Sequence, residues 1–167
     1  MREVVIALSL ALLAFVFPIA QAESDKGEAL DNPLGQYRIL AMCMINDENL
    51  SPDRVIAIYK SIDWAEFLER DLLLVEITSK GINTVLGKQR TSSNGVKVAT
   101  WNRVKHTDQD KLVKKVACQD NFDFVLIGKD TSVKKRWQGF LPLDDLYETI
   151  DAMPMRRHEM SQRKKRD

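Results

Sequence analysis

The sequence has few of the residue types that most often carry catalysis, metal binding or crosslinks. It contains two cysteines, Cys43 and Cys118, and two histidines, His106 and His158. Two cysteines are too few for a disulfide framework, so stability must come mainly from an apolar core. Neither histidine stands at ligand spacing with a cysteine or the other histidine, which gives no support to a metal site or a Ser-His-Asp triad. We therefore predict no metal and no cofactor.

Long apolar runs are also scarce, and the single one lies at the N-terminus. There Arg2 precedes an apolar run from Val4 to Phe17, and the small-residue sequence Ala20-Gln21-Ala22 follows. These three parts are typical of a cleavable secretory signal peptide, and the run is too short to span a bilayer comfortably. We expect residues 1–22 to be removed and the protein to be periplasmic or secreted, with no transmembrane segment after processing.

The formal net charge of +1 hides an uneven distribution. Residues 156–167 hold six Lys or Arg residues and two acids, whereas the chain between the signal peptide and this stretch is weakly acidic. We expect a flexible lead-in at 23–36, one domain at 37–155 and a basic tail at 156–167. The tail is either a contact for an anionic surface or a solvated C-terminus, and it does not indicate specific nucleic-acid binding.

The first half of the domain contains a strand, a helix and a second strand. Tyr37 to Ile45 is an almost continuous apolar run of strand length. Ser51-Pro52-Asp53 is a helix start, and apolar spacing predicts one helix from Pro52 towards Glu69. Leu72 to Ile77 is a second buried strand. A parallel pair with a right-handed crossover follows from this order.

The second half is predicted as an excursion and then a helix, two strands and a last helix. Asn94-Gly95 predicts a short hairpin within residues 82–106. Strands at Phe122–Ile127 and Val133–Trp137 are joined tightly enough to be antiparallel. The predicted helices cover Asp108–Cys118 and Asp144–Ala152, the latter ended by Pro154. This order predicts an α/β, thioredoxin-like fold with a mixed four-stranded sheet flanked by helices.

Three stretches of the chain also resemble a known family. They are Phe124–Asp130 with Val133-Lys134, Ile150–Arg157 with Glu159-Met160, and Glu69–Glu76. They are similar to a bacterial domain of unknown function, DUF4174, whose relatives occur in vertebrate matrix proteins of the sushi-repeat and equarin type. The resemblance covers Tyr37 to Met160 and implies a thioredoxin-like or peroxiredoxin-like fold in exported proteins. It supplies no catalytic residues, because the family has no established activity.

In a thioredoxin-like fold the reactive position lies between the first core strand and its helix, which here is Asn46 to Ser51. This segment holds no cysteine, so the Cys-x-x-Cys dithiol is absent. Its polar side chains instead predict a site for a cation or a basic partner, or simply turn chemistry. The residues concerned are Asn46, Asp47, Glu48 and Asn49.

Further binding candidates are Lys129, Asp130, Arg156 and Arg157, for which a solvated face is the alternative. Cys43 and Cys118 are predicted to come close, because the third core strand should run antiparallel beside the first. They would form a structural disulfide, or would act as a redox pair. The leading hypothesis is a non-catalytic binding or interaction module for an unknown protein or envelope component. The alternative is a thiol-dependent, peroxiredoxin-like redox protein using these two cysteines.

Overall fold

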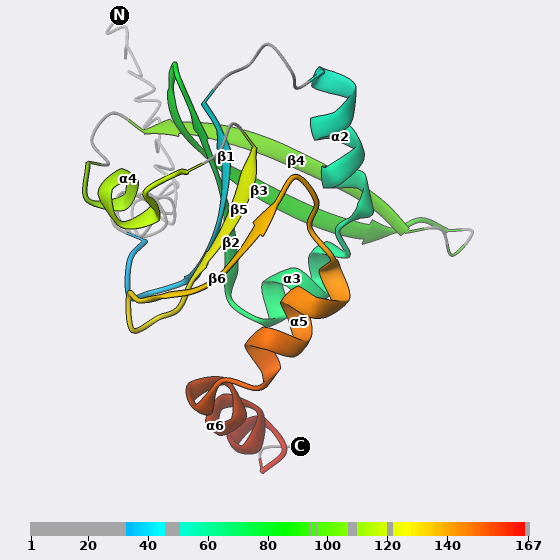
Figure 1. Cartoon of the computed structure of the whole chain (residues 1–167). Coiled ribbons are helices and arrows are strands. Elements are labelled where there is room, and N and C mark those ends of the chain that lie inside the picture. Colours follow the sequence, from blue (N-terminus) through cyan, green and yellow to red (C-terminus); the bar gives the residue numbers. More distant parts are fainter. Residues whose placement is uncertain are drawn as a thin grey trace, which may run out of the picture.

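The computed structural model describes residues 33–45, 51–93, 95, 97–106, 110–119 and 122–165 as one α/β unit (Figure 1). The predicted signal peptide lies outside these residues, as does most of the lead-in. No helix in the described part is long and apolar enough to cross a membrane. The elements are, in chain order, β1 (Arg38–Met44), α2 (Pro52–Ser61), α3 (Trp64–Glu69), β2 (Leu72–Thr78), β3 (Gly81–Thr91), β4 (Lys97–His106), α4 (Asp110–Val116), β5 (Asp123–Ile127), β6 (Val133–Gln138), α5 (Leu143–Asp151) and α6 (Pro154–Arg163).

The sheet has six strands in the order β4-β3-β2-β1-β5-β6. β1 and β2 are parallel, and β5 is antiparallel to β1, as the sequence predicted. The prediction of four strands is wrong, because residues 81–106 form a long hairpin, β3–β4, that extends the sheet beyond β2. Its turn lies at Gly95, whose φ of +79° favours glycine. The turn signal was therefore sound, but it marked two strands of ten and eleven residues rather than a short excursion.

Alternating side chains of β1 enter two separate cores. Leu40, Met42 and Met44 face one way, and Ile39, Ala41 and Cys43 face the other. The first core is covered by α2, α3 and α5, while the second is covered by α4 on the opposite face (Figure 1). Burial on both faces explains the continuous apolar run that identified this strand in the sequence.

The single helix predicted from Pro52 towards Glu69 is two helices. α2 ends at Ser61, and the backbone is extended at Ile62 before Asp63 caps α3 by accepting hydrogen bonds from the N–H groups of its first turn. The break lets Trp64 pack across β3, where a Cβ on Gly87 would come within 1.7 Å of the indole ring. Helical spacing of apolar residues did not reveal this change of direction.

The C-terminal segment also differs from the prediction. Pro154 does follow the end of α5, but it is also the first residue of a further helix, α6, which continues to Arg163. The stretch predicted to be a basic tail is thus largely a helix, and Arg156 within it is buried. The prediction failed because it considered only the number of charges and not their periodicity.

Candidate ligand-binding site

A cavity of about 530 Å³ opens at the carboxyl ends of the parallel strands β1 and β2, beside the start of α2. In open α/β sheets this edge is where ligands usually bind, because helices and loops there leave a crevice above the strands. One wall is apolar and is made by Met44, Pro52, Val55 and Ile56. The other wall is polar and is made by Glu76, Thr78, Lys80, Asn83 and Arg103.

Glu76 anchors the polar wall. It lies in β2 within an otherwise apolar sequence and is only 1% exposed. The hydroxyl of Tyr59 and the Nε of Arg103 donate to its Oε1, the latter at 3.1 Å. Asn83 Nδ2 donates to its Oε2 at 3.2 Å. A carboxylate removed from water is tolerated only with such partners, and these donors come from α2, β3 and β4.

Arg103 reaches this carboxylate from β4 through one edge of its guanidinium group. Its Nη2 lies 2.9 Å from Glu76 Oε1, and its Cζ stands 5.6 Å from the centre of the Tyr59 ring. Its side chain is nevertheless 50% exposed. Within the described residues the remaining nitrogen, Nη1, has no hydrogen-bond acceptor. The guanidinium group is therefore held in place by the fold, and its Nη1 is still able to donate a hydrogen bond into the cavity.

The arrangement is better suited to binding than to proton transfer. Both oxygens of Glu76 already accept hydrogen bonds from the protein, which leaves little capacity to accept a proton from a substrate. Tyr59 is fully buried and donates to the same carboxylate. The cluster thus fixes Arg103, and Arg103 is the member that can contact a ligand.

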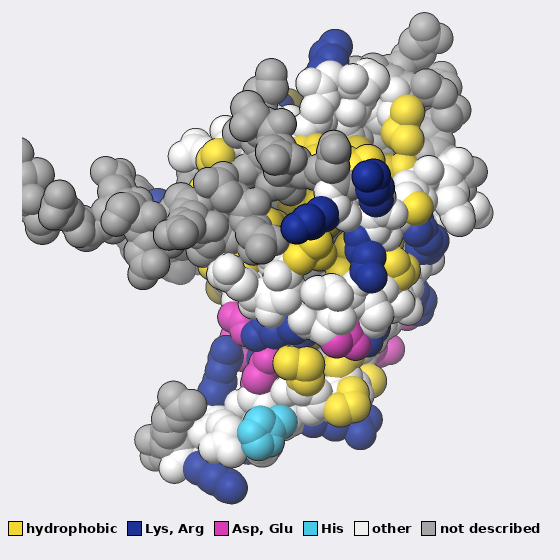
Figure 2. Space-filling view, turned by 90° about the vertical axis from the view of Figure 1, so that its left-hand side faces the viewer, with side chains coloured by type: hydrophobic (Ala, Val, Ile, Leu, Met, Phe, Trp, Pro, Cys, Tyr) yellow, Lys and Arg dark blue, Asp and Glu magenta, His cyan; other side chains and the backbone are white. Residues whose placement is uncertain are grey.

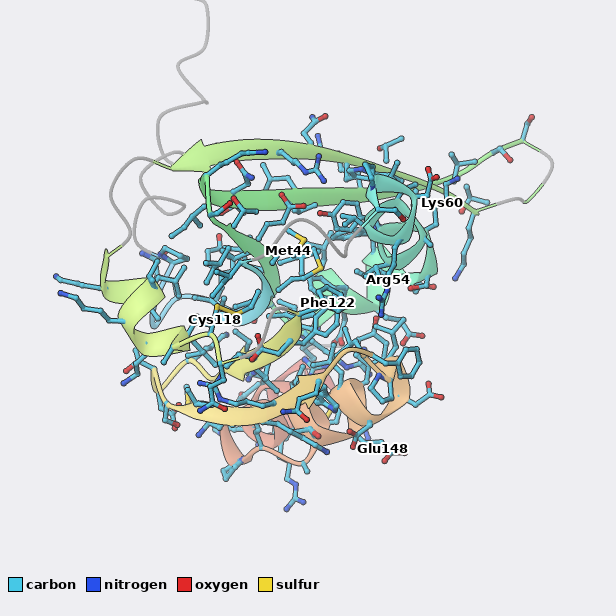
Figure 3. The ribbon with its side chains drawn as sticks, turned by 45° about the horizontal axis from the view of Figure 1, so that its top comes forward. Met44, Arg54, Lys60, Cys118, Phe122 and Glu148 are labelled. Atoms are coloured by element: carbon cyan, nitrogen blue, oxygen red, sulfur yellow. A yellow bond between two sulfur atoms is a disulfide. The ribbon has the colours of Figure 1, made fainter. Side chains whose placement is uncertain are left out.

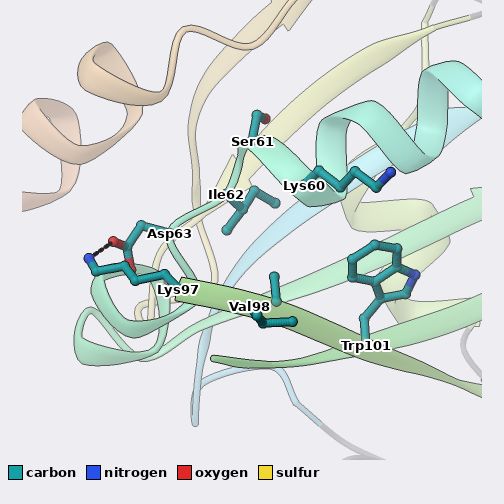
Figure 4. A pocket seen from close by; sticks show the side chains of 8 residues that line it. Lys60, Ser61, Ile62, Asp63, Lys97, Val98 and Trp101 are labelled. Atoms are coloured by element: carbon teal, nitrogen blue, oxygen red, sulfur yellow. Dashed lines mark hydrogen bonds and ion pairs between the residues drawn. The ribbon is translucent and has the colours of Figure 1, made fainter. Parts of the chain in front are cut away.

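A second cavity of about 490 Å³ lies between β4 and the junction of α2 with α3 (Figure 4). Trp101 and Lys60 line it. So do Lys97 and Asp63, which form an ion pair with 2.7 Å between Nζ and Oδ2. The hydrogen bond from Lys97 lowers the pKa of Asp63 and raises that of Lys97. Because Lys97 and Asp63 pair with each other, they are less available to a ligand than Arg103 is in the first cavity.

Cys43 and Cys118 form a disulfide with their Cα atoms 5.8 Å apart, so the proximity inferred from the strand order is confirmed. Figure 3 shows Cys118 on the side of α4, while Met44 lies towards α2. Cys43 is fully buried and Cys118 is partly exposed. The crosslink spans 75 residues and is expected to contribute about 4 kcal/mol in the chain-entropy model.

Asp123 pairs with Cys43 in the β1–β5 register, and one of its oxygens lies within 4.8 Å of both sulfur atoms. Asp123 also pairs with Arg136, whose Nη1 is 3.4 Å from Oδ2. Thiolates are the form of cysteine that binds metals, and a disulfide offers none. In this oxidised state the three groups are a crosslink beside a carboxylate.

The predicted residues Asn46, Asp47, Glu48 and Asn49 lie outside the described residues. They connect β1 with Ser51, and the neighbouring Met44 and Pro52 line the cavity. The cavity therefore lies at the edge of the sheet where β1 ends, directly before the predicted segment in the sequence. The structure adds two groups from more distant strands, Glu76 and Arg103.

Lys129 and Arg156 lie at the opposite end of β1, in a network of ion pairs that attaches α6. Arg156 Nε donates to Asp151 at 3.1 Å, and its Nη2 donates to Glu69. Lys129 donates to Asp71 at 2.8 Å and to Glu159 at 2.9 Å. Figure 2 shows acidic and basic side chains together where the C-terminal part meets the body of the molecule.

Two more predicted residues lie at the margin of this network. Asp130 pairs with Lys134 in the β5–β6 turn, and Arg157 is exposed on α6. Lys129, Asp130, Asp151 and Arg156 all come from the stretches that carried the family resemblance. Lys129, Asp151 and Arg156 form ion pairs that link α6 to the rest of the domain, while a binding role for Lys129, Asp130 and Arg156 stays a prediction.

Glu76, Arg103 and Asn83 were not recognised as site residues in the sequence. A detectable signal existed for Glu76, because a single acid interrupts the apolar run Leu72–Ile77 of a doubly covered strand. Arg103 and Asn83 had no such signal, since the hairpin predicted within residues 82–106 was short and its pairing was not predicted over the full length of β3 and β4. Only the sheet register brings them to the same carboxylate.

No curated protein and no solved structure shows significant similarity to this chain. A protein family does match, and its description is "Domain of unknown function (DUF4174)". The match covers residues 29–159, which include every strand of the sheet and most of α6. The chain therefore belongs to the DUF4174 family.

Proposed function

We propose that this protein is an exported, thioredoxin-like domain that binds a ligand without catalysing a reaction. The thioredoxin-like assignment is supported by the strands β2-β1-β5-β6. They lie side by side in the order expected for that core, with β1 parallel to β2 and antiparallel to β5, and with helices on both faces. The β3–β4 hairpin is then an extension at one edge of the core.

One observation carries the proposal. The cavity at the carboxyl edge contains a guanidinium group fixed by a buried carboxylate, whereas the two cysteines are joined in a disulfide and neither is available there as a thiol. Burying the Glu76 carboxylate costs free energy, and an ion pair with one buried member seldom increases stability over apolar packing. Keeping such a pair beside an open cavity is therefore better explained by recognition than by folding.

Export is supported by the N-terminal sequence and agrees with the disulfide. Disulfides persist mainly in oxidising compartments such as the periplasm and the extracellular space. The partner would be a soluble ligand or an envelope component that reaches the cavity.

The rival function is thiol-disulfide exchange by Cys43 and Cys118, which the partial exposure of Cys118 favours. Exchange needs one accessible sulfur and a stable thiolate after reduction. Full burial of Cys43 weighs against it. The stabilising crosslink is the role that agrees better with a loop of this length.

The test is an assay of insulin disulfide reduction and of peroxide consumption with the purified, mature protein. We expect the rates of the wild type to equal those of a Cys43→Ser, Cys118→Ser double variant, with and without dithiothreitol. Rapid turnover by the wild type that the double variant lacks would replace the binding proposal with the redox one.

A further inference from the structure

We propose that Cys43, Cys118 and Asp123 bind a zinc ion when the disulfide is reduced and release it when the disulfide forms again. This inference goes beyond the proposed ligand-binding function. Cys43 and Met44 point to opposite faces of β1, so the group lies on the side of α4, whereas the cavity lies on the side of α2. No spacing rule indicates the group in the sequence, because only the folded chain brings the three residues together.

The ligand atoms are close enough to share one ion. The two sulfur atoms and a carboxylate oxygen of Asp123 all lie within 4.8 Å of one another. A tetrahedral zinc ion, with bonds of about 2.3 Å to sulfur and about 2.1 Å to oxygen, holds such atoms about 3.6–3.8 Å apart. Small side-chain movements after the S–S bond breaks therefore form the site. Three ligands from the described residues leave the fourth position for water, which the partial exposure of Cys118 admits.

The fold holds the three residues in place without the disulfide. Cys43 and Asp123 are directly opposite each other in the antiparallel strands β1 and β5, and their side chains therefore share one face of the sheet. Cys118 follows α4, which packs on that face through buried apolar residues that include Val116. Arg136 of β6 donates to the carbonyl oxygen of Val116 and pairs with Asp123. Reduction thus removes one covalent bond and leaves the backbone around the site anchored.

The charges balance when zinc is bound. Two thiolates and the Asp123 carboxylate carry three negative charges, while Zn²⁺ and the guanidinium group of Arg136 carry three positive ones. This balance matters because Asp123 is only 1% exposed. The pairing with Arg136 does not prevent ligation, since each carboxylate oxygen has two lone pairs and metal-ligating carboxylates are hydrogen-bonded as well. Two thiolates with one oxygen suit zinc rather than calcium or magnesium, which prefer oxygen ligands alone.

The change of state needs a reductant, and a dithiol supplies it. The dithiol attacks the more exposed sulfur, that of Cys118, and two exchange steps transfer two electrons and two protons to the S–S bond. The products are the thiols of Cys43 and Cys118 and the disulfide of the reductant. Zn²⁺ then displaces the two thiol protons as the Zn–S bonds form. Because only the reduced protein offers thiolates, zinc should favour that form by mass action.

The test compares the mature wild-type protein before and after reduction with dithiothreitol, which is then removed without air. Co²⁺ is added as a spectroscopic probe, and Zn²⁺ is titrated against it. We expect the reduced protein to show thiolate-to-cobalt charge-transfer absorption and the visible bands of a tetrahedral site, and equimolar Zn²⁺ should abolish both. The oxidised protein should show neither. Absence of these bands from the reduced protein, or equal zinc affinity in the two states, would overturn the inference.

Two variants test the carboxylate ligand. Reduced Asp123→Asn should bind zinc at least about tenfold more weakly in competition with a zinc indicator, since losing even an outer hydrogen-bond partner of a metal ligand costs this much. Asp130→Asn makes the same change at an exposed carboxylate beyond the far end of β5, and it should leave the affinity unchanged. Unaltered affinity in Asp123→Asn would also reject the site, and the wild-type comparison decides the matter if this variant does not fold. Failure of zinc to bind leaves the cavity beside α2 untouched, so the two proposals fail separately.

Discussion

The molecule has two clusters of buried charge, one at each end of the parallel pair β1 and β2. At the amino ends, Arg38 is 1% exposed and pairs with Glu159 of α6, and Arg156 of α6 is 2% exposed. At the carboxyl ends, Glu76 is equally buried, but its partner Arg103 remains half exposed beside a cavity. Similar residues thus serve two different ends of the sheet, and the difference lies in whether a helix closes over them.

The hydrogen bonds of Arg156 and Arg103 distinguish the two clusters further. Arg156 donates to the side chains of Glu69 and Asp151 and to the carbonyl of Glu69. Burial raises the pKa of Asp151, yet hydrogen bonds from Arg70 and Arg156 outweigh it and lower the pKa overall. Charges satisfied in this way fix the position of a helix. In Arg103, by contrast, Nη1 has no acceptor among the described residues, so it could donate a hydrogen bond to a ligand.

We call the charges around Arg38 and Arg156 the closed cluster and those around Glu76 and Arg103 the open cluster. The largest effect on stability should come from breaking the closed cluster. Arg156→Met retains the length of the side chain but takes the buried cation away from Asp151 and Glu69, which keep only Arg70 and Arg163, respectively, as hydrogen-bonded partners. We expect the free energy of unfolding, measured with urea at pH 7, to fall by about 3 kcal/mol.

The neighbouring Arg157 provides a matched control, since it belongs to the same helix and is exposed. Arg157→Met should change stability by less than about 0.5 kcal/mol. Equal losses in the two variants would mean that α6 is not held by the buried pairs.

A smaller effect is expected at the open cluster. Glu76→Gln keeps the shape of the side chain and an acceptor for Tyr59, and Arg103 can turn to water because its side chain is half exposed. We expect a loss of about 1 kcal/mol in the same urea experiment. A loss as large as that of Arg156→Met would show that the cavity cluster is also a structural lock, and the contrast between the two ends would disappear.

Most of the core could be predicted from the sequence, because burial on both faces gives β1, β2 and β5 apolar runs that need no partner to be recognised. The β3–β4 hairpin could not be predicted in full. Its strands alternate polar and apolar residues less regularly, and only residues 81–85 pair with β2, so that most of their length depends on the pairing of β3 with β4. The helical spacing of apolar residues also did not reveal the break before Asp63. This break lets Trp64 pack against Gly87 in β3.

The candidate site was predictable only in its position. A strand followed by a capped helix locates the carboxyl edge, and the cavity is there. Its charged residues Glu76 and Arg103 lie 27 positions apart in different strands, and no rule of sequence spacing connects them. Lys129 and Arg156 were predicted from their places beside the hairpin and after the last helix, and these places alone could not show that both form ion pairs.

The smallest effect concerns the edge of the closed cluster, where Asp130 pairs with Lys134 in the β5–β6 turn. The hydrogen bond from Lys134, followed by that from the Ser132 N–H, lowers the pKa of Asp130 to about 2. A carboxyl whose pKa is lower in the folded state stabilises the fold above its unfolded pKa of about 4, and this contribution is lost as pH falls towards 2. Since Asp130 is 48% exposed, solvent screening keeps the stability effect small, and the titration itself is the better measurement.

The carboxyl carbon of Asp130, followed by NMR, should titrate near 2, and Lys134→Met should move the midpoint up towards 4. Because the pair is exposed, salt should have the same effect in the wild type, whereas Asp151, held between two arginines, should respond less. A midpoint near 4 with Lys134 in place would show that even this outermost pair is not formed, and would limit the closed cluster to the residues that α6 covers.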